Sequence, residues 1–421
     1  MNPDPSTTDG RRYYGLDAVR GVMMLLGIVI HAAMFYTVME SDVLPLKDRR
    51  TSPLFDLVLL LIHSFRMPLF FLVSGFFGAL LVEKYGMKGA YGNRTLRVFV
   101  PFLIALVTVL PLTGWMIISF GVSVDQGTRV LWTTNSAHLE WLLRLERKLG
   151  AAGPGHLWFL YYLMMLYLLM PLCALARRVF ERRGWTETLR RFTASPWLPV
   201  ALSTWTALTL WPYKGGLVQG FQFFAPHLPS LVYYGTFFVV GYLFHGFRDF
   251  LTTCERHLGA YFAASTLMFV ASLAPSDLDY RQGGTTTWLH LVTISLNGVL
   301  TWLLVYAMIG LFQRFLDRDS PWVAYISQSS YWVYLVHLPI VSFAAWCLVD
   351  IDVPAVVKFG FAAAFTTVVA FVSYHYLARR TWISVLLNGR RFSVGWPWLE
   401  PEGRAYSTAM GRETDPVRSR Q

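Results

Sequence analysis

The chain has 421 residues, of which 55% are hydrophobic, 16% aromatic and only 14% charged. An average soluble domain carries about 25% charged residues, so this composition argues against a soluble protein. The formal net charge of +11 at pH 7 would suit nucleic-acid binding. However, apolar runs of about 18 to 25 residues alternate with basic connections, which is typical of polytopic membrane proteins. We therefore predict an all-α fold that contacts the lipid bilayer, and no nucleic-acid partner.

Ten apolar segments are predicted as transmembrane helices. In chain order they are residues 15–38, 54–82, 97–120, 156–176, 197–213, 229–247, 259–275, 288–312, 321–346 and 354–378. If both termini are cytoplasmic, the connections assigned to the inside carry most of the 36 Lys and Arg residues, as the positive-inside rule requires. The predicted domains are a cytoplasmic arm at 1–14, a membrane domain at 15–387 and a polar cytoplasmic tail at 388–421.

Ionisable residues inside the first predicted helix share one face. Asp17, Arg20 and His31 are separated by three and eleven positions, and eleven positions return to within about 20° of the starting direction at 100° per residue. The rise from residue 15 to His31 is about 24 Å, which places the imidazole in the outer half of the membrane. Asp17 is equally suited to orient Arg20, to cap the helix or to contact substrate.

The second predicted helix contains HSFRMPLFFLVSG, residues 63–75. His63 and Arg66 are one turn apart, and Ser74 lies eleven residues after His63 on the same face. Because Pro68 removes a backbone hydrogen bond, we expect a kink beside Arg66. His63 lies about 14 Å below the outer end of its helix, near the depth of His31.

Two further histidines are candidates for the same layer. His337, in SSYWVYLVHLPI, reaches the depth of His31, and His156, in GPGHLWFL, lies at the outer end of the fourth helix together with Trp158. A single intramembrane histidine is often only a hydrogen-bonded contact between helices, and this alternative stays open. Arg94 and Arg97 form an RxxR pattern that suits either phosphate binding or anchoring at the inner surface.

This arrangement suits acyl transfer to an alcohol. A histidine can act as a general base near neutral pH, and an arginine with a second histidine can stabilise a developing oxyanion. The arginines at the inner end suggest a phosphate-bearing donor there, and the histidine layer suggests an acceptor that approaches from outside. No GxGxxG, Walker or HExxH pattern occurs, and the three cysteines lie far apart, so no metal site is predicted.

Four segments carry a resemblance to a known family: YYGLDAVRGVMMLLGIVIHAAMFY, HSFRMPLFFLVSGFF, HLWFL and SYWVYLVHLPI. Together they resemble the integral-membrane acyltransferase-3 family over about residues 11–390. Within it they are most similar to the branch that succinylates osmoregulated periplasmic glucans. The resemblance implies a ten-helix enzyme of the bacterial inner membrane that transfers an acyl group from acyl-CoA, here succinyl-CoA, to a periplasmic glucan. Glucan-synthesis proteins are possible partners, and no tightly bound cofactor is expected.

The resemblance also implies residue roles. It makes His31 the expected base and places Arg94 and Arg97 at the donor phosphates. Combined with the reasoning from the residues, the predicted catalytic residues are His31, Arg66, His63 and His337. Predicted donor-binding residues are Arg20, Arg94 and Arg97, and predicted substrate-binding residues are His156, Trp158, Ser74 and Asp17.

Two alternatives remain. One is O-acetylation of another surface polysaccharide or glycoside. The other is a transporter or flippase that uses His31, His63 and His337 as a proton relay.

Overall fold

The computed structural model describes residues 7–8, 11–39, 47–131, 138–141, 143, 153–218 and 223–392. Two antiparallel strands of two residues each, β1 (Thr7–Thr8) and β2 (Arg11–Arg12), precede the first helix. The rest of the described chain consists of helices and their connections, which confirms the all-α prediction. Most of the predicted arm and tail, at 1–14 and 388–421, lies outside the described residues.

The first half of the chain contains three long helices and several short ones. They are α1 (Tyr14–Met34), α2 (Pro53–Arg94), the π-helical turn η1 (Thr95–Phe99), α3 (Val100–Gln126), the 3-10 turn η2 (Gly155–Leu157), α5 (Trp158–Tyr167), α6 (Met170–Arg182) and α7 (Thr186–Thr193). Ser52 caps α2 by accepting a hydrogen bond from the Leu54 N–H, and Pro53 fills the first helical position.

The apolar segment predicted at 54–82 corresponds to the first part of α2, and helical structure continues to Arg94. The helix is interrupted at Gly86, where φ is 67°, a value that glycine adopts at little cost. Pro68 lies inside the helix, and the dihedral angles around it are helical. The kink expected beside Arg66 stays a prediction.

The described residues of the second half of the chain are also arranged in helices and their connections. Its elements are α8 (Leu198–Leu210), the 3-10 turn η3 (Lys214–Gly216), α9 (Leu228–Phe244), α10 (Asp249–Arg256), α11 (Leu258–Arg281), α12 (Thr287–Leu316), α13 (Pro321–Trp346), α14 (Ala355–Ser373), the π-helical turn η4 (Tyr374–Ala378) and α15 (Trp382–Asn388).

The helices mark the chain as a multi-pass membrane protein, although the predicted number of crossings is not confirmed. In the described part, five continuous helical stretches are long and apolar enough to cross a bilayer. The number rises to seven if the bent pairs α5–α6 and α9–α10, with angles of 45° and 110°, are each one crossing. All ten predicted segments coincide with helices, but α8 has only 13 residues, fewer than the roughly 20 that a crossing needs.

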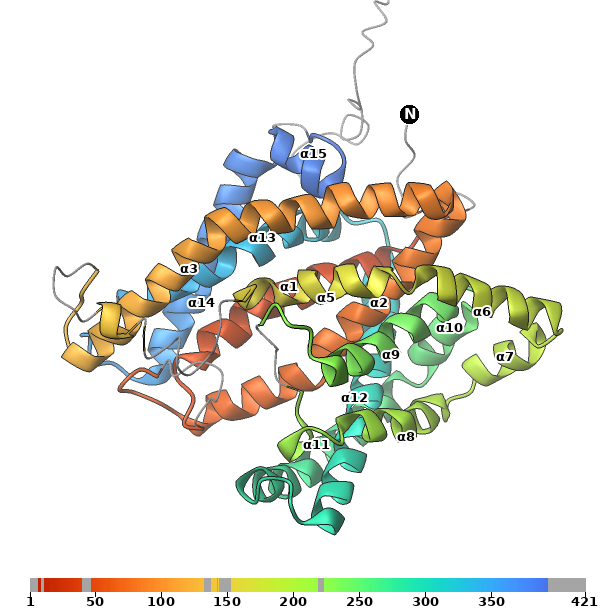
Figure 1. Ribbon diagram of the computed structural model, residues 1–421, viewed down its shortest axis with the longest axis horizontal. Helices are drawn as coiled ribbons and strands as arrows, with labels where there is room; N and C mark the ends of the chain where they lie inside the picture. Colours follow the sequence, from red (N-terminus) through yellow and green to blue (C-terminus); the bar gives the residue numbers. More distant parts are fainter. Residues whose placement is uncertain are drawn as a thin grey trace, which may run out of the picture.

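Helix α1 occupies the middle of the molecule (Figure 1). It packs against α13, α2 and α12, while α3 and α14 flank α13. On the other side α9 packs on α2, and α8 and α11 pack on α12. The predicted active-site helices, residues 15–38, 54–82 and 321–346, therefore lie at the centre of the bundle.

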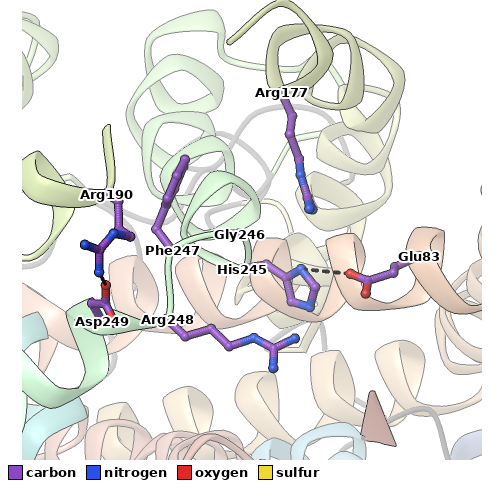
Figure 2. A pocket seen from close by; sticks show the side chains of 8 residues that line it. All are labelled: Glu83, Arg177, Arg190, His245, Gly246, Phe247, Arg248 and Asp249. Carbon is purple, nitrogen blue, oxygen red and sulfur yellow. Dashed lines mark hydrogen bonds and ion pairs between the residues drawn. The ribbon is translucent and has the colours of Figure 1, made fainter. Parts of the chain in front are cut away.

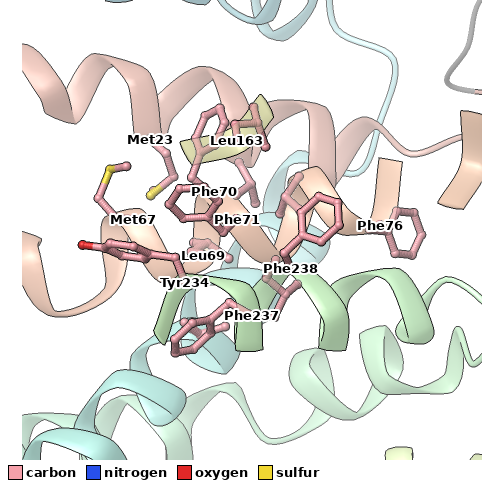
Figure 3. Close-up of a cluster of buried hydrophobic side chains, with 14 of the residues drawn as sticks. Met23, Met67, Leu69, Phe70, Phe71, Phe76, Leu163, Tyr234, Phe237 and Phe238 are labelled. Atoms are coloured by element: carbon pink, nitrogen blue, oxygen red, sulfur yellow. The ribbon is translucent and has the colours of Figure 1, made fainter. Parts of the chain in front are cut away.

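The contact between α2 and α9 depends on two glycines. A Cβ on Gly75 would collide with the carbonyl of Phe238, and a Cβ on Gly241 would collide with the carbonyl of Leu72. The two backbones therefore touch, as small residues allow in membrane helix pairs. Aromatic side chains of α2 and α9 pack beside this contact, where Phe71 and Tyr234 have ring centroids 4.8 Å apart (Figure 3). This contact fixes the helix that carries His63 and Arg66.

Candidate active site

Four histidines from distant parts of the sequence meet in one cluster. The rings of His31 on α1 and His337 on α13 have centroids 5.1 Å apart, and His156 of η2 lies 6.0 Å from His337. His63 on α2 lies within electrostatic range of His31. We call these four side chains the imidazole cluster. The structure thus brings together the histidines that the sequence placed at one depth, while their individual roles remain predictions.

The hydrogen bonds of His337 define its basic nitrogen. Its Nδ1 lies 2.6 Å from the Tyr334 carbonyl oxygen and 3.1 Å from that of Val333. A carbonyl only accepts, so Nδ1 carries the proton, and Nε2 of the neutral ring keeps a lone pair. Nε2 is buried and has no hydrogen-bond partner among the described residues. His337 therefore presents a proton acceptor to the cluster.

His31 and His156 are tethered in the same way. Nδ1 of His31 lies 3.3 Å from the sulfur of Met34, a weak acceptor, and Nε2 of His156 lies 3.3 Å from the carbonyl of Leu335. Nδ1 of His156 is buried without a partner in the described part of the chain. Each tethered ring thus has one nitrogen held by an acceptor and the other left to take a proton.

A buried guanidinium faces the imidazole cluster. Arg66 is 7% exposed, and its Nε donates to the carbonyl of Met23 at 2.8 Å. A Cβ built on Gly27 would lie 2.7 Å from Arg66 Nη2 and 3.5 Å from His337 Nε2. The missing side chain at Gly27 therefore lets the guanidinium and the basic nitrogen approach the same point. A fixed positive charge beside a proton acceptor suits a reaction in which an oxyanion develops.

A small cavity adjoins His63 at the junction of α2, α9, α12 and η3. Its volume is about 10 Å³, enough for roughly one water molecule. It is lined by His63, Ser64, Pro68, Gly216, Leu217, Val218, Tyr233, Tyr234, Asn297 and Thr301. Sequence reasoning missed Asn297, although an amide inside the predicted helix 288–312 is the kind of signal that could have revealed it.

Trp158 packs against Tyr234, one of the residues that line this cavity. Its indole has its centroid 5.4 Å from the ring of Tyr234, and Tyr234 lines the cavity. Trp158 itself is half-buried on α5. The substrate-binding role of Trp158 remains a prediction. Tyr234 contacts Trp158 and lines the same cavity as His63, so it connects the two residues.

A second group of predicted residues gathers around aromatic rings away from the cluster. Arg20 bonds Asp17 at 3.2 Å and lies 5.1 Å from the centroid of Phe77. Arg94 lies 4.9 Å from the centroid of Tyr167, close enough to Arg20 for the two charges to interact. The guanidinium groups of Arg20 and Arg94 thus lie near each other and form one cationic site. Asp17 holds Arg20 there through its hydrogen bond.

Arg97 and Ser74 lie apart from these groups. Arg97 falls in η1, a π-turn that is wider than an α-turn, so the angle between Arg94 and Arg97 around the axis differs from that in an α-helix. The guanidinium of Arg97 instead contacts Gly389 after α15. Ser74 is buried on α2 about 12 Å along the axis from Arg66. The shared face expected for the RxxR pair and its binding of donor phosphates stay predictions.

No group of three or more His, Cys, Asp or Glu side chains within the described ranges is arranged to hold a metal ion. The basic nitrogen of His337 lies beside Gly27 and Arg66, and the other three imidazoles lie around it. Their arrangement can accept a proton from a hydroxyl and place positive charge beside the carbonyl that this hydroxyl attacks.

Comparison with known proteins gives a consistent result. A family model described as an acyltransferase domain matches residues 13–375. Curated relatives named glucans biosynthesis protein C, from Escherichia coli strain K12 and from Escherichia coli O1:K1 / APEC, are each 27% identical over 354 residues. The matched region covers 82% of this chain and 84% of each relative. No solved structure matches significantly.

Proposed function

The chain belongs to the acyltransferase-3 family and is a membrane acyltransferase, and we propose that it moves a succinyl group from succinyl-CoA to hydroxyls of a periplasmic glucan in the bacterial inner membrane. The observation that carries the proposal is the imidazole cluster facing Arg66, since it combines proton acceptors with a buried cation in one place. The printed name of the curated relatives supports the choice of glucan as acceptor.

In the proposed reaction the acceptor hydroxyl oxygen attacks the thioester carbonyl carbon. A C–O bond forms, the C–S bond breaks, and the hydroxyl proton passes to His31. That proton then goes to the sulfur that leaves as the coenzyme A thiol. His31 is suited to this role because its Nδ1 is held by Met34, which leaves Nε2 as the base.

Arg66 is proposed to stabilise the tetrahedral intermediate. Its guanidinium is held by the Met23 carbonyl and borders the open position at Gly27. A preorganised cation in a site that excludes water lowers the energy of a developing oxyanion without reorganising. The pair of Arg20 and Arg94 is proposed to hold phosphates of the donor, because guanidinium groups bind phosphate through paired hydrogen bonds.

The proposal is tested by His31→Asn, because asparagine keeps a short donor toward Met34 but cannot take a proton. We expect cells that carry this variant to make glucans without acyl groups, at an unchanged level of membrane-inserted protein. The matched control is His257→Asn, which changes a histidine between α10 and α11. Normal glucan substitution by the His31 variant would refute the assignment of the base.

The acyl group is identified by mass analysis of the modified glucan. Succinylation adds a carboxylate and makes the glucan anionic, whereas acetylation adds no charge. A neutral mass increase would replace succinyl-CoA by acetyl-CoA as the donor and leave the acyltransferase assignment intact. Modification of another glycoside, with unmodified glucan, would refute the acceptor.

A further inference from the structure

A tyrosine of α13, Tyr331, carries a buried hydroxyl group that the proposed reaction does not use. The hydroxyl oxygen makes no hydrogen bond within the described part of the chain. A buried hydroxyl that is left unpaired costs free energy, and such groups are uncommon in folded proteins. Tyr331 therefore has hydrogen-bonding capacity for a polar group of a ligand.

A second polar atom with the same property lies near this hydroxyl. Nε of Arg94, at the end of α2, is buried and has no hydrogen-bond partner among the described residues. Its guanidinium lies 4.9 Å from the ring centroid of Tyr167, and it is close enough to Arg20 and Tyr331 to act on both electrostatically. Two helices, α2 and α13, thus bring two unused hydrogen-bond donors into one region.

Tyr331 also lies between the cationic site and the imidazole cluster. Along α13, Tyr331, Tyr334 and His337 follow one another at intervals of three residues, and the rise from the first to the last is about 9 Å. The Tyr334 ring has its centroid 6.0 Å from that of His337, and Tyr334 lies within electrostatic range of Arg66. The same helix therefore leads from the neighbourhood of Arg94 to that of Arg66.

The hydroxyl of Tyr334 is already used within the protein. It donates a hydrogen bond to the carbonyl oxygen of His156 at 2.9 Å. The corresponding oxygen of Tyr331 has no partner in the ranges that the structure describes. Of these two tyrosines on the line between the two sites, Tyr331 is the one whose hydroxyl can bind a ligand without breaking a printed contact of the fold.

From these contacts we infer that Tyr331 is a donor-binding residue, whose hydroxyl donates a hydrogen bond to an oxygen of the acyl donor beside Arg94. The inference rests on the proposed function, because a donor with its phosphates at Arg20 and Arg94 and its thioester at His31 passes this part of α13. The oxygen belongs to a phosphate or to an amide carbonyl of the coenzyme A arm, since both accept a hydrogen bond from a hydroxyl.

The test compares Tyr331→Phe with Tyr306→Phe in the purified full chain. Tyr306 of α12 is the matched control, because its buried hydroxyl also lacks a partner among the described residues, and its ring packs near Tyr261 and Trp302 instead. Each variant removes one unpaired hydroxyl, so neither should lower the denaturant midpoint. We expect Tyr331→Phe to weaken equilibrium binding of coenzyme A about threefold to tenfold, the loss of one hydrogen bond, and Tyr306→Phe to leave it unchanged.

Failure of this inference is distinguishable from failure of the proposed function. If the unaltered chain binds coenzyme A and Tyr331→Phe binds it equally well, the role of Tyr331 is overturned and the proposed donor stands. If the unaltered chain binds no coenzyme A, the proposed donor is refuted and the role of Tyr331 falls with it.

Inorganic pyrophosphate, as a second probe, identifies the oxygen that Tyr331 contacts. Weaker binding of both coenzyme A and pyrophosphate by Tyr331→Phe indicates a phosphate oxygen. Weaker binding of coenzyme A alone indicates an oxygen of the amide-bearing arm. Both results support the inference.

The unaltered protein provides a second measurement if Tyr331→Phe fails to fold. In a structure with coenzyme A bound, we expect the hydroxyl oxygen of Tyr331 to lie about 2.5–3.0 Å from an oxygen of the ligand. A ligand bound elsewhere, or a hydroxyl directed away from it, would contradict the inference.

Discussion

Two buried histidines, His290 and His337, show how differently the same residue can be used in this molecule. In His290 both ring nitrogens are bonded, Nδ1 to Asp279 at 2.9 Å and Nε2 to the carbonyl of Trp211 at 2.9 Å. In His337 only Nδ1 is bonded, and the buried Nε2 faces Gly27 and Arg66 with no hydrogen-bond partner in the part of the chain that the structure describes. His290 therefore stabilises the junction of helices, whereas His337 retains capacity for a substrate.

Two buried cations, Lys358 and Arg66, also differ in whether their hydrogen-bonding groups are paired within the protein. Lys358 is 1% exposed and donates to both oxygens of Asp48, at 2.8 and 2.9 Å. Arg66 is also buried, yet within the described residues it pairs with no carboxylate and donates only to a carbonyl. An uncompensated buried charge costs several kcal/mol. This cost is offset at Lys358 by Asp48 but not at Arg66, which supports the prediction that the imidazole cluster is the functional site.

The largest expected effect is on activity, through His337→Asn. The asparagine amide can still donate to the carbonyl of Tyr334, but the basic nitrogen is gone. If His337 accepts or relays a proton, acyl transfer should fall about 10²- to 10⁴-fold, while the denaturant midpoint of the purified protein stays unchanged. Full activity would place His337 with His290 as a structural residue and break the comparison.

The next effect is on stability, through Lys358→Met. This change leaves the Asp48 carboxylate buried without its partner, and removal of one member of a buried pair costs about 3–5 kcal/mol. We expect this loss in the free energy of unfolding, from denaturant titration in mixed micelles. The control is Lys358→Met combined with Asp48→Leu, which should recover most of the loss. A double variant no more stable than the single one would contradict the ion-pair explanation.

A smaller loss of stability is expected for His290→Phe. The aromatic ring roughly keeps the volume, but the Asp279 carboxylate loses a hydrogen-bond donor, and 0% of the Asp279 side chain is exposed. A hydrogen bond to a charged group contributes about 1.5–3 kcal/mol, so the free energy of unfolding should fall by that amount. The activity of the protein that remains folded should be unchanged. Loss of activity without loss of stability would assign His290 to the reaction.

The sequence predicted the imidazole cluster because helical rise is regular. His31 and His337 lie equally far from the predicted starts of their helices at residues 15 and 321, so their depths could be compared before any fold was known. Which helices are neighbours depends instead on close packing, such as the contact of Gly75 and Gly241 between α2 and α9. No periodic pattern encodes that contact.

The directions of Arg97 and of the bent helices could not be predicted from the sequence, because they depend on local backbone geometry. The RxxR pattern predicts one face only if the helix is an α-helix, and the π-turn at Thr95–Phe99 changes the direction of Arg97. The bent pair α5–α6 begins within the single apolar segment predicted at 156–176, although the chain changes direction there by 45°. Helix α10 lies between the segments predicted at 229–247 and 259–275, where only a connection was expected.

A pocket lined by His245, Arg248 and Asp249 forms at the 110° bend between α9 and α10 (Figure 2). Nothing in the sequence indicated this bend, because these residues are typical of a polar connection.

The smallest effect is expected for an exposed ion pair beside Lys358. Arg50 bonds Asp352 at 2.7 and 2.9 Å, but the two side chains are 57% and 74% exposed. The hydrogen bond from Arg50 lowers the pKa of Asp352, so any stabilisation is present at neutral pH and is lost as the pH falls through the acidic range where this carboxylate is protonated. Water and salt screen such a pair, so Arg50→Gln should leave the denaturant midpoint at pH 7 almost unchanged. A loss as large as that of Lys358→Met would show that exposure does not decide which ion pairs stabilise this end of the bundle.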